Sequence, residues 1–117
     1  MAFASVDAKT FAAWETEGQI FYATIKDGAP AAAVAAPGNS NRRRFPAVAT
    51  SGREVLLAWT EGMAWDRGGC LAWQVYDAGD QPLKNGKTAD YGRADGVPVW
   101  SVISTIALSD GRFVIIY

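Results

Sequence analysis

The sequence predicts an all-β fold of four-stranded antiparallel blades of the propeller type, with about two and a half blades in the chain. The first observation behind this prediction is a repeated phrase. It consists of an apolar strand ending in Ala-Trp, an acidic turn, an aromatic-rich strand and a Gly/Asp turn before a proline. The phrase runs over 11–30, recurs over 56–82 and begins again at 106–117. Because Trp14 aligns with Trp59, the spacing matches the roughly 40 to 50 residues of a propeller repeat.

The second observation is that two predicted strands are apolar on both faces. Residues 55–59 (VLLAW) and 113–117 (FVIIY) show no polar alternation. In an antiparallel sheet such a strand must be covered on both sides, which stacked blades achieve and a simple sandwich does not.

The third observation is that no segment of the sequence predicts a helix. The alanine-rich stretch 29–37 is short and bracketed by prolines, so we expect 31–35 to form an outer strand instead.

The remaining elements follow from the order of the repeat, in which each unit holds strands A, B, C and D. Residues 2–9 form a weak A strand, and the repeated phrase supplies strands B and C. Residues 45–53 (FPAVATSGR) and 102–112 (VISTIALSDGR) supply the A strands and following turns of the next two units. The chain is thus expected to form one partial propeller domain over 1–117. Its units lie at approximately 2–44, 45–98 and 99–117.

The lengths of the connections predict where a binding surface lies. In a four-stranded meander the B–C and D–A connections leave one end of the blade, and the A–B and C–D turns leave the other. The predicted A–B and C–D turns are short and rich in Gly, Asp and Ser. The long connections 37–44, 61–69 and 85–98 gather on the opposite rim. Loops on one rim of a rigid scaffold are where binding residues usually lie.

Three polar groups on this rim are candidate ligand-binding residues. In the glycine-flanked loop, Trp65 beside Asp66 and Arg67 has the chemistry to stack on a sugar or clamp a carboxylate. The alternative is that Trp65 folds down over a blade end. The arginine run suits an anion, or else is a solvated loop or a partner contact. The third group, at 91–95, is similarly polar. The candidates are Arg42, Arg43, Arg44, Trp65, Asp66, Arg67, Tyr91, Arg93 and Asp95.

Other recurring residues have a structural interpretation. Glu17 and Glu61 each follow a repeated tryptophan strand, and this recurrence favours a turn role over catalysis. The tryptophans are predicted to be core or blade-packing residues of strands. They are Trp14, Trp59, Trp73 and Trp100.

Composition excludes several classes of function. The net charge is −1, with 11 basic and 12 acidic residues, which predicts no binding to nucleic acid or an anionic membrane. The chain has no histidine and one cysteine. The chain therefore lacks the commonest general base, and its composition predicts that it binds no metal and no cofactor. We expect Cys70 to be a small buried residue of a strand. No run is long enough to span a membrane, and residues 1–14 lack a signal-peptide pattern, so the location stays open.

The second unit, FPAVATSGREVLLAWTEGMAWDRGGCLAWQVYD, with the later GVPVWS and SDGRFVIIY, resembles the C-terminal part of sialidase-like β-propeller proteins. The resemblance covers most of the chain and is specific mainly from Arg44 onward. It implies six four-stranded blades and a bacterial source. True sialidases of this family use an arginine cluster, a Tyr/Glu nucleophile pair and an acidic residue. The family's Asp-box turn is degenerate at 109–111 and absent at 51–52, and no catalytic residue matches position by position.

These observations predict a noncatalytic binding or assembly module, with carbohydrate as the ligand class that the resemblance implies. Two and a half blades cannot close a ring and would leave apolar faces and a strand edge uncovered. We therefore expect a homo-oligomer that forms through blade faces and the C-terminal strand. The alternative is a fragment of a sialidase-like glycoside hydrolase, in which Arg67, Tyr91, Arg93 and Asp95 supply part of a shared site.

Overall fold

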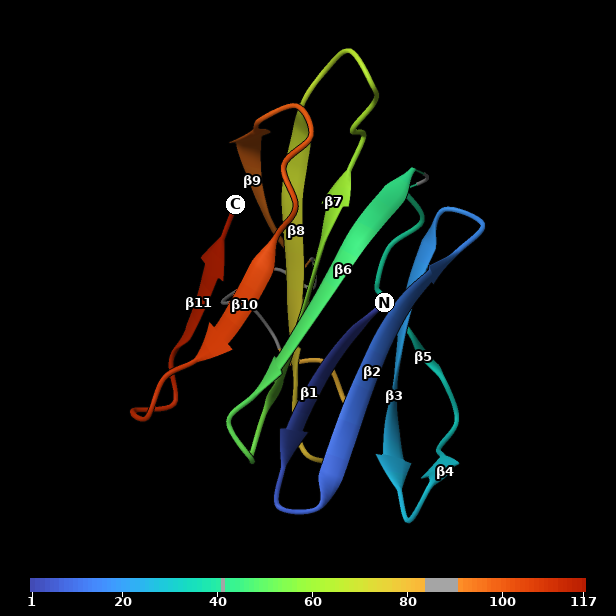
Figure 1. Ribbon diagram of the computed structural model, residues 1–117, viewed down its shortest axis with the longest axis vertical. Coiled ribbons are helices and arrows are strands. Elements are labelled where there is room, and N and C mark those ends of the chain that lie inside the picture. The colour runs from blue at the N-terminus through green and yellow to red at the C-terminus, as the bar shows by residue number, and fades with distance from the viewer. Residues whose placement is uncertain (41, 84–90) are drawn as a thin grey trace.

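The computed structural model describes residues 1–40, 42–83 and 91–117, and these form antiparallel β-sheets (Figure 1). No helix occurs in this described part of the chain, so none of its segments is a helix that could cross a membrane. The prediction of an all-β fold is confirmed at the level of antiparallel sheets.

The first sheet contains β1 (Ala2–Val6), β2 (Lys9–Thr16) and β3 (Gln19–Lys26) in that order. Two short strands, β4 (Ala29–Pro30) and β5 (Val34–Ala35), both pair with the free edge of β3. The predicted outer strand at 31–35 is therefore present only in its last two residues. Pro30 has no backbone N–H to donate, which explains why the edge is divided into short pieces.

The second sheet has the order β6 (Arg43–Thr50), β7 (Val55–Glu61), β8 (Gly69–Tyr76) and β9 (Gly92–Val97). Strand β9 contradicts the predicted loop over 85–98, of which 85–90 lie outside the described residues. Its sequence GRADGV has low strand propensity, but its backbone pairs with β8 from Gly69 to Trp73. Pairing with a well-formed neighbour outweighs propensity here.

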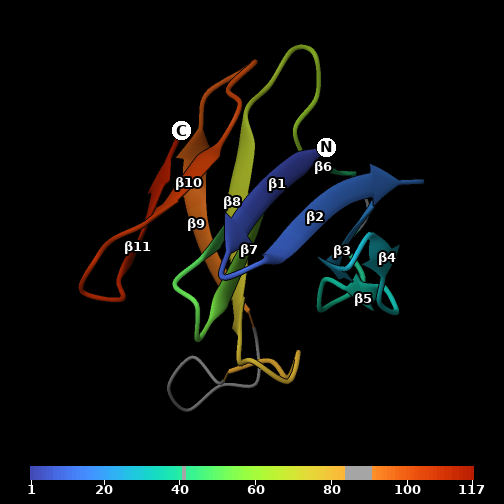
Figure 2. The ribbon, with the colours of Figure 1, turned by 60° about the horizontal axis from the view of Figure 1, so that its bottom comes forward.

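The third sheet is the hairpin of β10 (Ser104–Ala107) and β11 (Phe113–Ile116). Strand β6 packs beside β1 and β2 on one side and beside β10 on the other (Figures 1 and 2). Trp100 lies in the connection before β10 and not in a strand as predicted. Its φ is 64° and its side chain is exposed, because the chain turns there between Pro98 and Ser101.

Two hydrophobic cores cover the two faces of the second sheet. Every residue of β7 is buried, as the two-faced apolar pattern of 55–59 predicts. In contrast, β11 is covered on one side only, since its residues alternate between half-buried and exposed. The core between the first two sheets contains Phe11, Ala13, Ile20, Tyr22, Ala36, Val48, Val55, Leu57, Trp59, Ala72 and Tyr76. The core on the side of the hairpin contains Ala47, Ala58, Met63, Leu71, Val97 and Ile103, with Ile115 packed against it.

Two connections of the second sheet and the loop that leads into it meet at one end. Arg43 pairs with Glu61 and Gly69 pairs with Val97, so the chain enters β6 where it leaves β7 and β9. The connections 62–68 and 98–103 and the loop leading to β6 therefore meet at this end, which we call the long-loop rim. The turns after β6 and β10 lie at the opposite end.

The connection between β8 and β9 also leaves at the opposite end, because Tyr76 at the end of β8 pairs with Val55 at the start of β7. The prediction that every long connection gathers on one rim is therefore wrong.

Candidate functional site

The run of three arginines at the long-loop rim is divided between two environments. Successive side chains of a strand point to opposite faces. Arg43, the first residue of β6, is 0% exposed, whereas Arg42 and Arg44 are exposed. The interpretation of the run as a solvated loop is therefore wrong for its central residue.

Arg42 and Arg44 line one open hollow together with the loop between β7 and β8. Reciprocal backbone hydrogen bonds of 3.2 and 3.3 Å between Ala64 and Arg67 close the tip of this loop. They hold Trp65 outward, so that its side chain is 77% exposed. The hollow, which we call the rim hollow, has a volume of ≈ 560 Å³. It is lined by Arg42, Arg44, Met63, Ala64, Trp65, Asp66 and Arg67.

The rim hollow is cationic. It brings three guanidinium groups together with the single carboxylate of Asp66, in a protein whose net charge is −1. Among the residues that the structure describes, none of these three guanidinium groups has a salt-bridge partner. Unpaired arginines beside an exposed indole have the chemistry to receive a planar anion.

Behind the rim lies a buried cluster around Glu61, which we call the Glu61 cluster. The carboxylate is 2% exposed. Its Oε1 accepts hydrogen bonds from Arg43 Nε (3.1 Å), Trp59 Nε1 (2.9 Å) and the Tyr91 hydroxyl (3.0 Å), and Arg93 Nη2 lies 3.4 Å from Oε2. The buried charge is thus paired and hydrogen-bonded, as burial requires.

The prediction of a turn role for Glu61 is wrong. Glu17, its proposed equivalent, does lie in a tight turn with a φ of 52°. Glu61 instead ends β7, two residues after Trp59. Counted from Trp14, the equivalent residue is Thr16 and not Glu17. The shared acidic-Gly pattern therefore hides a shift of one residue.

Arg43 also holds the loop that leads to the rim. Its Nη1 donates to the carbonyl of Ala36 (3.3 Å) and its Nη2 to that of Pro37 (2.6 Å). The guanidinium carbon lies 5.3 Å from the centre of the Trp59 ring, within the range of a cation–π contact. At Gly38 the φ is 79°, and a Cβ atom there would lie only 2.6 Å from the Tyr91 ring. Only glycine fits this approach of loop and ring.

Arg93 and Asp95 alternate along β9 and so share one face of the sheet with Glu61 and Cys70, and Tyr91 immediately precedes the strand. They lie with the Glu61 cluster, and none of them lines the rim hollow. Burial, followed by the hydrogen bond to Glu61 and its charge, raises the pKa of Tyr91. The hydroxyl therefore stays protonated and donates a hydrogen bond to Glu61.

Cys70 lies in β8 as predicted but is half-buried. Its thiol donates to Asp95 Oδ1 at 2.9 Å. This hydrogen bond, together with burial, raises the pKa of the thiol. A raised pKa reduces the thiolate fraction, which disfavours a nucleophilic role.

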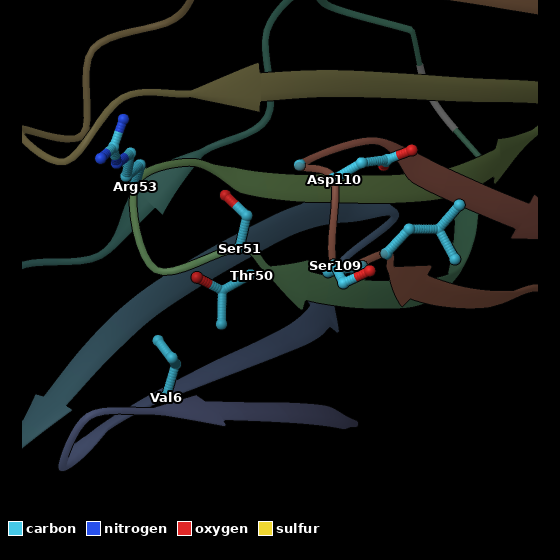
Figure 3. A pocket seen from close by; sticks show the side chains of 9 residues that line it. Val6, Thr50, Ser51, Arg53, Ser109 and Asp110 are labelled. Atoms are coloured by element: carbon cyan, nitrogen blue, oxygen red, sulfur yellow. The ribbon is translucent and has the colours of Figure 1, made fainter.

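A further hollow lies at the opposite end, between the turns after β6 and β10 (Figure 3). Three of its polar side chains, those of Thr50, Ser51 and Asp110, form hydrogen bonds within their own turns. Thr50 Oγ1 donates to the Glu54 carbonyl at 3.1 Å, and Asp110 accepts from Arg112 Nε at 2.7 Å. This hollow is a gap between neighbouring turns.

The structure therefore defines an all-β protein with a cationic, aromatic hollow on one rim and a buried acidic cluster behind it. In the described part of the chain no three His, Cys, Asp or Glu side chains are close enough to hold a metal ion. Comparison of the chain with protein families, curated proteins and solved structures found no match.

Proposed function

We propose that this chain is a noncatalytic binding module of the β-propeller type whose rim hollow binds an acidic glycan. The observation that carries the proposal is the convergence of Trp65 with Arg42, Arg44 and Arg67 on one hollow. The interpretation of the sheets as blades is supported by their order in the chain and by the burial of the second sheet on both faces.

The chemistry of the hollow fits a sugar that carries a carboxylate. The face of the exposed Trp65 indole is apolar and suits the C–H face of a pyranose ring. A guanidinium group binds a carboxylate through two parallel hydrogen bonds, which a neutral sugar cannot form. Uronic acids and sialic acids both combine these two features. The ligand class also agrees with the carbohydrate that the sialidase-like resemblance implies.

The first test compares two sugars that differ in the carboxylate. Titration followed by NMR is expected to show binding of glucuronic acid and little binding of glucose. Trp65→Ala and Arg67→Ala are each expected to weaken binding about tenfold, corresponding to about 1.4 kcal/mol. Binding should also weaken as salt screens the arginines.

Trp100→Ala is the matched control, since Trp100 is also exposed but does not line the rim hollow. Its affinity for glucuronic acid should equal that of the wild type. Equal binding of glucose and glucuronic acid, or full affinity in Trp65→Ala, would refute an acidic-glycan site.

The second candidate function is a sialidase-like glycoside hydrolase. One observation favours it: the Tyr91 hydroxyl lies 3.0 Å from Glu61, with Arg43 and Arg93 beside them. The resemblance implies such a Tyr/Glu pair and arginine cluster. However, the Glu61 carboxylate is already enclosed by its donors, and the raised pKa of Tyr91 disfavours a nucleophilic phenolate. These two facts lead us to prefer the noncatalytic function.

A fluorogenic sialoside separates the two candidates. We expect no release of the fluorophore above the rate of the buffer blank. Release that is lost in both Tyr91→Phe and Arg67→Ala would replace the binding module with the hydrolase. Release that persists in both variants would point to a contaminating enzyme and leave the noncatalytic proposal in place.

The same proposal includes self-association through sheet faces and through β11. In the described part of the chain β11 pairs only with β10, so its other edge presents unpaired backbone groups. Unpaired edges and uncovered apolar faces favour association with another chain.

A further inference from the structure

We infer that copies of this chain associate head to tail, with the outer face of the β1–β3 sheet of one copy packed on the outer face of the β10–β11 hairpin of the next. The inference rests on the self-association proposed above. It adds which two surfaces meet and that they differ from each other.

The first surface is the side of the β1–β3 sheet that faces away from the second sheet. Phe3 pairs with Ala12 and Trp14 pairs with Phe21, and strand alternation puts all four on this side. Phe3 is 62% exposed, and the Trp14 and Phe21 rings stack with centroids 6.0 Å apart. The face has no charged side chain. Its members are Phe3, Ser5, Thr10, Ala12, Trp14, Phe21, Ala23 and Ile25.

The second surface is the outer side of the hairpin. Ile115 packs against the second sheet, so its neighbours Val114 and Ile116 point the other way. Ile106 pairs with Val114, and Ile116 is 53% exposed. With Ser104, these residues again form an uncharged face. Phe3 on the first surface and Ile106 and Ile116 on the second are each about half exposed or more, whereas Ala12 and Ala23 of the first surface are buried.

The interface inside the chain shows how such faces fit together. Phe11 and Ala13 on β2 share the first core with Leu57 and Trp59 on β7. By the alignment of Trp14 with Trp59, Ala12 and Trp14 are the repeat equivalents of Leu57 and Trp59. The outer face of the first sheet is therefore equivalent to a face that another sheet of this chain already covers.

The hairpin supplies the complementary face. Phe113 and Val55 are each the first residue of their strand to pair after the preceding turn. Counted from them, Val114 and Ile116 correspond to Leu56 and Ala58. These two are in turn the repeat equivalents of Phe11 and Ala13. The two outer faces thus correspond to the two partners of the internal interface, which points to a second copy as the occupant of each.

Because the two faces differ, the contact is heterologous and each copy has one face of each kind. This predicts an outcome that a symmetric contact cannot give. Phe3→Glu blocks the first face and Ile116→Glu blocks the second, since a charge in an apolar contact is costly. In sedimentation velocity the wild type should be associated, and each variant alone should be a monomer. An equimolar mixture of the two variants should form a 1:1 dimer through their intact faces.

Three outcomes of this experiment would contradict the head-to-tail contact. A single variant that dimerises on its own would show a face packing on itself and overturn the head-to-tail contact. An equimolar mixture of the two variants that stays monomeric would also overturn the head-to-tail contact. A monomeric wild type would overturn both this inference and the proposed self-association. Binding of glucuronic acid by Trp65 and its neighbours is measured separately and is not decided by these results.

Folding of the variants is checked by circular dichroism and thermal unfolding. Phe3 and Ile116 are each more than half exposed, so both variants should keep the fold. Ser5→Glu and Ile106→Glu place the same charge on the same two faces. They replace either variant that fails to fold, and the expected results are the same.

Discussion

Arg43→Met is expected to lower the free energy of unfolding by about 3–5 kcal/mol, because it leaves the Glu61 carboxylate buried without its main partner. The substitution also removes the donors that hold the carbonyls of Ala36 and Pro37. Urea unfolding followed by tryptophan fluorescence measures the effect.

The arginine run provides its own controls. Arg42→Met and Arg44→Met make the same chemical change at exposed positions, and each should alter stability by no more than about 0.5 kcal/mol. In the double variant Arg43→Met with Glu61→Met, both charges are gone, so much of the lost stability should return. An Arg43→Met protein as stable as the Arg42→Met protein would show that the ion pair contributes little.

Trp59→Ala is expected to destabilise the protein by about 3–5 kcal/mol, as for other large residues removed from a core. Trp59 is fully buried, and its ring lies 5.4 Å from that of Tyr91. The substitution removes this packing and also the indole N–H that donates to Glu61. Thermal and urea unfolding at low protein concentration measure the loss without a contribution from association.

Trp14→Ala is the matched variant at the equivalent position of the repeat. Trp14 is half-buried on the outer face of the first sheet and stacks on Phe21. Its removal should cost clearly less than that of Trp59. Equal losses for the two variants would contradict the different environments of the two repeats. Trp59→Phe should fall between wild type and Trp59→Ala, since it keeps a ring but loses the hydrogen bond.

The parts of the fold that sequence could predict are those in which side-chain pattern and environment agree. The unbroken apolar run at 55–59 has one explanation in an antiparallel sheet, and β7 is indeed buried along its whole length. The segment GRADGV has no such pattern. Its strand depends on the backbone of β8 and on close packing, since the Trp73 indole lies where a Cβ of Gly92 would be. Contacts of this kind have no local signal in the sequence.

Only some of the candidate residues come together in the rim hollow. Trp65, Asp66 and Arg67 do meet Arg42 and Arg44 in one hollow. The buried acidic cluster was missed because the pairing of Glu61 with Arg43 depends on which face each residue occupies. Three consecutive arginines have no polarity pattern from which that face could be predicted. Gln19 and Gly38, which also hold the rim loop, are similarly known only from tertiary contacts.

The bulge in β6 determines which arginine is buried. The register between β6 and β7 shifts between Arg44 and Ala47, and a change of one residue in a strand exchanges its two faces. With three identical side chains in a row, a slip by one residue would still place a guanidinium group opposite Glu61. The ion pair therefore cannot select the alignment of these strands. The alignment is instead selected by the apolar residues from Ala47 to Ala49, and the bulge then determines which arginine of the run is buried and which are exposed.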